Sequence, residues 1–485
     1  MMSRRSGVVV AVVAVAMCSA LLSGVSSAAG KEVAAGARGG VLSGSWGTAQ
    51  EVPGTAALNK GGNGGVNSVS CASAGNCGAA GSYTDGSGHF LAFVVTEKNG
   101  SWGTAEKVPG VVNRGGTVAI NSVSCGSPGN CSASGSYIAL TGASPAFVVN
   151  QTNGVWGTSE KLPGRLNLGR GAGISSVSCA TAGNCSAGGS YADSFNNSQA
   201  MVVTETNGVW GTAQKVPGSV ALNKGGNAQV NSVSCATAGN CSAAGFYAGS
   251  SGQQALAVTE KNGIWGTAKE VPGTAALNKG GNAQVNSVSC ATAGNCSAGG
   301  FYAGSSGHPQ AFAVTEKNGV WGTAKEVPGT AALNNGGNAD VSSVSCRSPG
   351  NCSAVGSYTD SSGHFQAFVA GQKNGVWGTA KEIPGTAALN RGGDADVTSV
   401  SCTSPGNCSA GGSYTDGSGR HQVFLVTETN GAWGSAEEVP GSAALNKGGS
   451  AEILSVSCAP AGNCSAGGDY YDASHHLQAF AVSQT

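Results

Sequence analysis

Hydrophobic and polar residues alternate along most of this chain with the two-residue period of β-strands, and no stretch carries a helical period. In one copy of the pattern, short turn segments separate four alternating runs, at 285–290, 296–302, 310–316 and 320–327. We call these four predicted strands A, B, C and D. Asn-Gly connects C to D, and this dipeptide accepts the positive φ that a two-residue hairpin requires. The pattern therefore predicts an antiparallel meander.

The same pattern recurs through the chain, and two residue types mark its period. The eight tryptophans lie in the D strands, 54 to 56 residues apart: Trp46, Trp102, Trp156, Trp210, Trp265, Trp321, Trp377 and Trp433. All but one of the 17 cysteines form C-x5-C pairs between A and B: Cys71 and Cys77, Cys125 and Cys131, Cys179 and Cys185, Cys235 and Cys241, Cys290 and Cys296, Cys346 and Cys352, Cys402 and Cys408, Cys458 and Cys464. Four strands in about 55 residues is the size of a β-propeller blade. We predict an all-β fold, an eight-bladed β-propeller of four-stranded antiparallel blades.

The two ends of the repeat array are in complementary phase. The array begins with a lone D strand at 44–53 and ends after a C strand at 477–482. Pairing of the N-terminal strand with the C-terminal blade would complete an eighth blade and remove two exposed strand edges. We therefore expect the propeller to span 44–485 and to be closed by this pairing.

Residues 1–29 are typical of a secretory signal peptide. Arg4 and Arg5 precede a small-apolar stretch at 7–22, and small residues suited to cleavage follow at 25–29. Residues 30–43 are then a linker. No later apolar run is long enough to span a membrane, so we expect a secreted, extracellular protein with no membrane association after cleavage.

The cysteines of an exported chain indicate disulfides when they are even in number and regularly spaced. The C-x5-C spacing is wider than that of usual zinc ligand pairs, and no histidine shares the period, so we expect no metal. Each pair is predicted to bridge its own A and B strands. Loop-closure entropy gives each bridge roughly 2–2.5 kcal/mol.

Charge and motifs exclude several functional classes. The net charge is zero and 10% of the residues are charged, which argues against nucleic-acid binding and electrostatic membrane docking. No G-x-S-x-G, H-E-x-x-H or Walker loop occurs. Acids such as Glu316 and Glu326 repeat beside the strands, whereas a glycosidase needs two carboxylates in unlike environments. We therefore expect no cofactor and favour a protein without catalytic activity.

The motif V-S-V-S-C-x5-C-x-A-x-G-x-Y, followed by N-G-x-W, resembles the repeats of secreted actinobacterial β-propeller proteins over 44–485. It is more distantly similar to the Asp-box propellers of sialidases and to photosystem II assembly-factor propellers. The Asp-box pattern is only echoed at 204–210, where the Asp is absent and the turn is one residue shorter. The resemblance implies the fold and does not imply sialidase activity.

Candidate binding residues come from two sets of loops. The D-to-A connection carries an Asn, followed in most copies by Lys or Arg, and the B-to-C turn carries all six histidines. Propellers gather these loops on one face, and binding residues concentrate on the loops of rigid scaffolds. The candidates are Asn278, Lys279, Arg165, Arg170, His475 and His476. The alternative is a turn-forming Asn beside a solvated base. Tryptophans and tyrosines that recur in every copy favour packing over sugar stacking.

Three functional hypotheses follow. The favoured one is a secreted, monomeric, non-catalytic scaffold that binds a glycan, a cell-wall polymer or a protein. The second is an extracellular hydrolase or lyase with its site in the central funnel. The third is a structural surface protein without a discrete ligand. A central cluster of unlike acids and bases would favour the second.

Overall fold

The structure is a computed structural model, and it describes residues 44–110, 117–139, 143–164, 166, 171–460 and 462–484. The chain divides into two compact units, Met1–Arg38 and Gly39–Thr485. The first unit, with the predicted signal peptide and most of the linker, lies outside the described residues.

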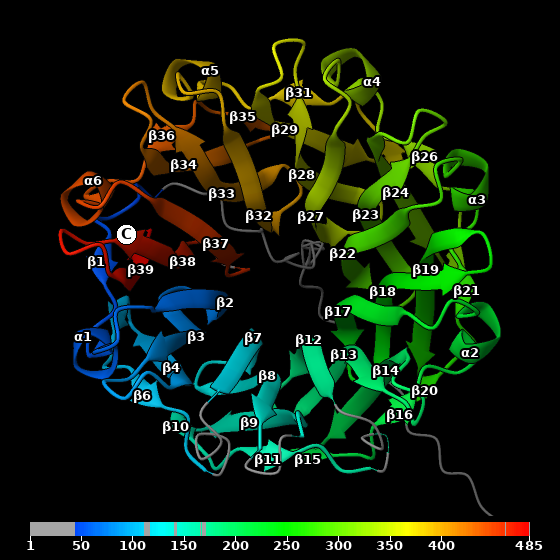
Figure 1. The fold of residues 1–485 in the computed structure, drawn as a ribbon, viewed down its shortest axis with the longest axis horizontal. Coiled ribbons are helices and arrows are strands. Elements are labelled where there is room, and N and C mark those ends of the chain that lie inside the picture. Colours follow the sequence, from blue (N-terminus) through cyan, green and yellow to red (C-terminus); the bar gives the residue numbers. More distant parts are fainter. Residues whose placement is uncertain are drawn as a thin grey trace, which may run out of the picture. The chain divides into compact units, whose positions relative to one another are not determined.

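One four-stranded antiparallel meander is the building block of the second unit (Figure 1). In the copy that served as the pattern, the strands are β22 (Ala283–Thr292), β23 (Asn295–Ala303) and β24 (Pro309–Lys317). Two short strands, β25 (Val320–Trp321) and β26 (Lys325–Glu326), both pair with β24. The all-β architecture of repeated four-stranded sheets is that of a β-propeller.

The other copies have closely matching bounds. The A strands are β2 (Gly65–Ser73), β7 (Thr117–Ser127), β12 (Ala172–Thr181), β17 (Ala228–Thr237), β27 (Ala339–Ser348), β32 (Ala395–Ser404) and β37 (Ala451–Cys458). The B strands are β3 (Asn76–Thr84), β8 (Asn130–Ile138), β13 (Asn184–Ala192), β18 (Asn240–Gly249), β28 (Asn351–Thr359), β33 (Asn407–Thr415) and β38 (Cys464–Tyr471). The C strands are β4 (Phe90–Lys98), β9 (Ala146–Thr152), β14 (Ser198–Thr206), β19 (Gly252–Lys261), β29 (Phe365–Lys373), β34 (His421–Thr429) and β39 (Leu477–Ser483).

The D segment differs from the sequence prediction, which made it one strand. Its first part is β5 (Ser101–Trp102), β10 (Val155–Trp156), β15 (Val209–Trp210), β20 (Ile264–Trp265), β30 (Val376–Trp377) and β35 (Ala432–Trp433). Its second part is β1 (Gln50–Glu51), β6 (Glu106–Lys107), β11 (Glu160–Lys161), β16 (Gln214–Lys215), β21 (Lys269–Glu270), β31 (Lys381–Glu382) and β36 (Glu437–Glu438). The break falls at the Gly-Thr-Ala segment. At this segment the chain leaves β24, and the Ala324 amide donates instead to Pro272 O of the preceding repeat (2.7 Å).

Six single-turn helices are the second departure from the prediction, which contained no helix. They are α1 (Thr55–Leu58), α2 (Ser219–Leu222), α3 (Thr274–Leu277), α4 (Thr330–Leu333), α5 (Thr386–Leu389) and α6 (Ser442–Leu445). Each occupies a D-to-A connection. Four residues are too few to show a helical period, which is why the pattern missed them.

Neighbouring sheets pack through alternating large and small faces. Phe312 and Val314 lie in a cluster with Ala255 and Ala257 of the preceding sheet. Ala311 and Ala313, on the other face of β24, pack with the following sheet. Strand C therefore has the bulky and small faces that its alternation predicts, and the close packing of the sheets follows from it.

Glycines in strand B allow this close approach, as the Gly-Gly pair predicts. A Cβ on Gly300 would lie 2.0 Å from the Gln284 carbonyl oxygen, and one on Gly299 would lie 2.5 Å from Val341 Cγ1 of the next sheet. Alanine at Gly300 would therefore collide with backbone and separate the strands.

The sheets follow one another around a ring in which the A strands are innermost (Figure 1). Among the described residues there are seven sheets. One, with ten strands, contains two repeats joined by a parallel bridge between Phe90 and Thr117. Another joins the two ends of the described chain, since β1 pairs antiparallel with β39 and Glu51 lies opposite Phe480. This is the strand pair that the phase of the two ends predicts.

The eight predicted disulfides are confirmed. Each joins the two cysteines of one C-x5-C motif, from Cys71–Cys77 to Cys458–Cys464. Within the described residues, no helix is long and apolar enough to cross a membrane.

We expect replacement of Cys290 and Cys296 by Ala to lower the free energy of unfolding by about 2 kcal/mol, because the disulfide restricts the conformations that the unfolded chain can adopt. Equilibrium urea unfolding measures the change, with mild reduction of the wild type as a comparison. Peptide mapping without reductant should recover the other seven bridges unchanged. A substantial linkage between repeats would contradict the strand assignment.

Candidate binding grooves between neighbouring repeats

The repeated tryptophans are not equivalent in the folded chain. Trp265 is 4% exposed, and its Nε1 donates to Thr204 Oγ1 of the preceding repeat (3.1 Å). Trp321 and Trp377 are only partly buried, and their Nε1 atoms are buried without a hydrogen-bond partner. The packing role expected for all eight tryptophans therefore describes Trp265 well. At Trp321 and Trp377 the indole also borders a cavity.

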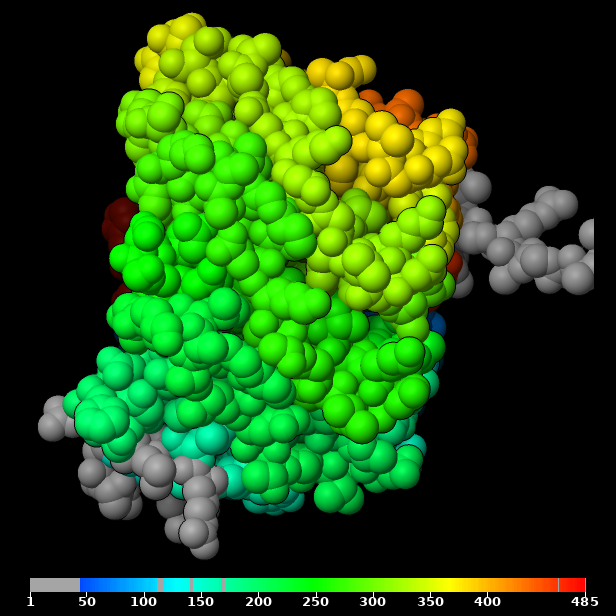
Figure 2. All heavy atoms as spheres, turned by 90° about the vertical axis from the view of Figure 1, so that its right-hand side faces the viewer, coloured from blue at the N-terminus to red at the C-terminus, as the bar shows by residue number. Residues whose placement is uncertain are grey.

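A groove runs beside each of these two indoles, between neighbouring repeats. The groove at Trp321 measures about 570 Å³ and that at Trp377 about 500 Å³. Figure 2 views the ring from the side of the repeats that form them. The first is lined by three residues of β19, by five around β21 and by three at the next tryptophan: Ala257, Val258, Thr259, Gly266, Thr267, Lys269, Glu270, Pro272, Gly319, Val320 and Trp321. The second is lined by the equivalent residues one repeat later.

The two grooves share an alanine at one register position, and both alanines line their groove. Ala257 faces Lys269 in the β19–β21 register, and Ala313 faces Lys325 in the β24–β26 register. At the same register position the preceding repeat has Val202, opposite Gln214. A third alanine at this position, Ala481 opposite Gln50, lies one repeat before Trp102, which is 7% exposed, so the alanine contributes space to a groove without opening one by itself.

The groove walls combine apolar and polar groups. Val320 and Val376, which precede the tryptophans, are 70% and 71% exposed. Lys269 is exposed, and Glu270 is partly buried. The Tyr247 hydroxyl donates to Glu270 Oε2 (2.7 Å), which orients the carboxylate. Burial raises the pKa of Tyr247, and the hydrogen bond to Glu270 raises it further, so the phenol stays a donor.

The sequence-predicted rim residues lie elsewhere. Asn278 is 5% exposed. Its Nδ2 donates to Gln253 O (2.8 Å) and Gln254 Oε1 (3.0 Å), and its Oδ1 accepts from the Asn282 amide (2.8 Å). Its polar atoms therefore fasten the connection to strand C. Lys279 beside it is exposed.

His475 and His476 are both exposed, in the last B-to-C turn. A Cβ on Gly62 would lie 2.5 Å from His476 Cδ2, and the Leu477 amide donates to Gly62 O (2.9 Å). This B-to-C turn thus lies against the D-to-A connection of the next repeat. The remaining candidates, Arg165 and Arg170, lie outside the described residues.

Sequence reasoning missed a group of acids that differs between the copies. Asp340, Asp396 and Glu452 are each the second residue of an A strand, and Asp469 faces Glu452 across the β37–β38 pair. Burial raises the pKa of Asp340, and burial together with the Asp340 charge raises that of Asp396 to about 6. Burial and the Glu452 charge raise the pKa of Asp469 to about 7. Other copies carry Gly65, Ala119, Gly173, Gln229 and Gln284 at this register position. An alignment of the eight copies at this position would have revealed these acids from the sequence alone.

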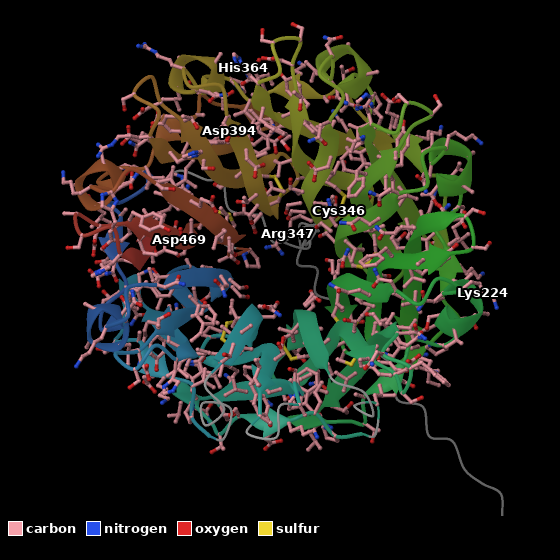
Figure 3. All side chains as sticks on the ribbon, in the orientation of Figure 1. Lys224, Cys346, Arg347, His364, Asp394 and Asp469 are labelled. Atoms are coloured by element: carbon pink, nitrogen blue, oxygen red, sulfur yellow. A yellow bond between two sulfur atoms is a disulfide. The ribbon has the colours of Figure 1, made fainter. Side chains whose placement is uncertain are left out.

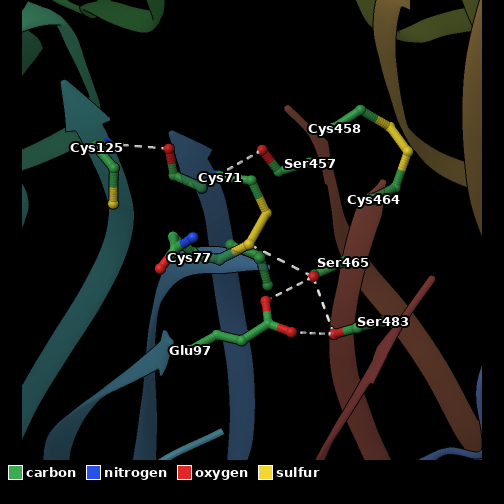
Figure 4. The surroundings of a disulfide bond; sticks show 12 residues. Cys71, Cys77, Glu97, Cys125, Ser457, Cys458, Cys464, Ser465 and Ser483 are labelled. Atoms are coloured by element: carbon green, nitrogen blue, oxygen red, sulfur yellow. Dashed lines mark hydrogen bonds between the residues drawn. A yellow bond between two sulfur atoms is a disulfide. The ribbon is translucent and has the colours of Figure 1, made fainter. Parts of the chain in front are cut away.

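The repeated Glu at the end of strand C is structural. Glu316, expected to flank its strand, is 1% exposed and accepts from Ser242 Oγ (2.8 Å) and Thr259 Oγ1 (2.7 Å) of the preceding repeat. Glu97 makes the same bonds to Ser465 and Ser483 from the other end of the chain (Figure 4). Among the described residues, one group has metal-ligand spacing, Cys71, Cys77 and Glu97, but its thiols form a disulfide.

Comparison with known proteins leaves the family open. No protein family model matches the chain, and no curated protein sequence matches it. Among solved structures it resembles Chaetomium thermophilum Sqt1 bound to the N-terminus of ribosomal protein L10, with 12% identity, TM-score 0.47, and 87% of this chain and 98% of that chain covered. It also resembles the six-bladed fucose-recognising lectin of Aleuria aurantia, with 10% identity, TM-score 0.35, and coverage of 77% and 95%. A third is the N11 neuraminidase-like protein of the flat-faced bat strain, with 11% identity, TM-score 0.34, and coverage of 71% and 96%. At these values no ligand or activity transfers to this chain.

Proposed function

We propose that this protein is a secreted, non-catalytic, eight-bladed β-propeller that binds a glycan or cell-wall polymer in the grooves beside Trp321 and Trp377. The observation that carries the proposal is the occurrence, in two successive repeats, of an open groove that combines a partly exposed indole, an exposed valine and a Lys-Glu pair. These grooves suit a glycan better than a protein ligand, because a sugar ring matches the width of a single indole and its hydroxyl groups match the polar groups of the groove wall.

Closure of the ring is part of this proposal. Every described junction between neighbouring repeats uses a Ser hydroxyl that accepts from the next A strand, as Ser232 Oγ does from the Val288 amide (3.1 Å). Between the last and the first repeat, Ser455 Oγ accepts from the Val69 amide (3.0 Å) in the same way. Equivalent bonds at the junction of the two ends support a closed ring, in which each repeat has two neighbours.

The repeated grooves suit a repetitive ligand. Aromatic rings stack on the apolar faces of sugars, and the Lys and Glu of the groove wall can form hydrogen bonds with sugar hydroxyl groups. Two grooves one repeat apart would engage two units of one polymer, and the second contact would form at a high effective concentration. Secretion, the actinobacterial resemblance and the monomeric state remain predictions from the sequence.

The test is a glycan array probed with the mature protein, followed by titration of the best ligand with variants that fill the grooves. A257V with A313V copies the side chain at Val202, retains both tryptophans, and should weaken binding at least tenfold. V320S with V376S should weaken it less, since only exposed apolar contact is lost. Melting temperatures measured in parallel establish that the variants are folded. Full binding by the groove-filled variant would contradict the placement of the site.

The rim supplies the control and the competing location. K279A and H475A with H476A alter exposed side chains on the loops that the sequence favoured. Asn278 is omitted from this test because its side chain is buried, so its removal would also reduce stability. Loss of binding in these rim variants, with the groove-filled variant unaffected, would place the ligand on the rim instead.

A second function is favoured by one observation, the acid pair of Asp469 and Glu452. A carboxyl group with a pKa near 7 beside a second acid is the arrangement that general acid catalysis of glycoside cleavage uses. Incubation of the array ligands with wild-type protein and with D469N, followed by analysis for shortened chains, tests hydrolysis or lyase cleavage. An array with no bound glycan and no cleavage would favour a structural surface protein.

A further inference from the structure

The eight repeats place equivalent residues around the inner end of the A–B hairpins, and one of them is unlike the rest. The residue after the first cysteine of each pair is small or uncharged in seven repeats, and Arg347 in the other. The seven are Ala72, Gly126, Ala180, Ala236, Ala291, Thr403 and Ala459. Figure 3 shows Arg347 beside Cys346, pointing toward the centre of the ring. The charge of this ring of residues therefore resides in one side chain.

Arg347 borders a central cavity of about 310 Å³. The lining comes from successive hairpins and consists of cystine, Ala and Gly residues, with Pro460 on one side; Arg347 is its one charged member among the described residues. At about 30 Å³ for each water molecule, the cavity has room for a small polyatomic ion and several waters.

The guanidinium is held in place by backbone alone. Arg347 Nε donates to Cys402 O of the next repeat, and Nη2 donates to Cys458 O of the repeat after that (3.1 Å). None of the ion pairs among the described residues includes Arg347. A guanidinium has five N–H donors in a planar fork, so three remain after these two bonds. The side chain is exposed to the cavity, and partial desolvation by the surrounding protein lowers the pKa of Arg347.

We infer that Arg347 forms a binding site for a small oxyanion, such as sulfate, phosphate or a carboxylate, at the hairpin end of the central cavity. The two carbonyl contacts fix the orientation of the fork, and the remaining N–H groups are suited to two oxygens of one anion. The rest of the lining offers no side-chain charge, so binding depends on this one residue. The site is distinct from the grooves beside Trp321 and Trp377, and it does not depend on glycan binding.

Isothermal titration of the mature protein with sodium sulfate, phosphate or acetate, at constant ionic strength in chloride, tests the inference and separates the three chemistries. We expect one saturable site with a dissociation constant in the millimolar range and at least a tenfold loss of affinity in R347A. R347K keeps the charge but not the fork, so it should bind with intermediate affinity. R391A is the matched control, since Arg391 is exposed and its Nε donates to a backbone oxygen, Ala388 O; it should bind as the wild type does.

A second measurement covers the case in which R347A does not fold. Selenate diffused into crystals of the wild-type protein should give an anomalous-scattering peak beside the Arg347 guanidinium. Equal affinity in the wild type and R347A would overturn the inference. So would the absence of saturable heat for all three anions, or of a selenate peak at Arg347.

Discussion

Deletion of residues 44–54 is expected to lower the melting temperature by about ten degrees or more. The deletion removes β1 and, with it, at least three backbone hydrogen bonds to the rest of the ring: from the Gly47 amide to Ser483 O (2.9 Å), from the Val52 amide to Ala479 O (3.0 Å) and from the Ala49 amide to Pro440 O (2.7 Å). It also removes the Val52 side chain, which is fully buried. Burial of one such side chain contributes about 1.5–3 kcal/mol, and each hydrogen bond about 1 kcal/mol. The sum is about 5 kcal/mol, and each kcal/mol corresponds to roughly 2–4 °C.

The same deletion would expose the edge of β39, so the truncated protein should also self-associate at high concentration. Differential scanning calorimetry and light scattering measure the two effects. Moving residues 44–54 to the C-terminus through a short flexible linker should restore the melting temperature, because the strand can then pair with β39 from the same chain. An unchanged melt in the deletion variant would argue for an open array rather than a closed ring.

The replacement D469N is expected to raise the free energy of unfolding at pH 8 by about 2–4 kcal/mol. Burial, and then the Glu452 charge, raise the pKa of Asp469 in the folded state to about 7, from an unfolded value of 3.8. A pKa that rises from 3.8 to about 7 on folding corresponds to about 4 kcal/mol of stability. The electrostatic interaction with Glu452 is shared between the two carboxyl groups, so the effect of replacing Asp469 alone is smaller. Because the folded-state pKa is raised, the protonated carboxyl contributes stability that is present below pH 4 and is lost as the pH rises through about 7. Asp396, with a pKa of about 6, acts in the same direction.

Thermal unfolding between pH 4 and 8 measures this linkage. The wild type should lose stability as the pH rises from about 4 to about 7, D469N should lose less, and the two should converge near pH 4. D472N is the control three residues away. Asp472 Oδ1 accepts from the Ser474 and His476 amides, its pKa is lowered, and its stabilising effect is lost only as the pH falls below about 4. A wild-type stability independent of pH between 5 and 8 would contradict the raised pKa values.

Much of the fold follows from the local pattern. The alternation in strands A to C and the Cys spacing specify which strands pair and which cysteines bond, because these contacts join residues close in sequence. The broken D segment and the helices at Thr274–Leu277 and its equivalents were missed. The D segment is interrupted because the Ala324 amide forms a hydrogen bond to the preceding repeat. The helices escaped prediction because a single turn is too short to show a helical period.

The sequence by itself determined the β-propeller type of fold, the hairpins and the eight disulfides. The tertiary structure alone decided what the differences between the copies do chemically. Ala257 lines a groove at Trp321, and Arg347 bonds to Cys402 and Cys458, across one and two repeat boundaries. Glu452 changes the pKa of Asp469 across a strand pair. The physical reason is that cavity volume, desolvation and charge coupling depend on distances between residues of different strands and repeats, and the periodic pattern, which makes the copies look alike, carries no information about those distances.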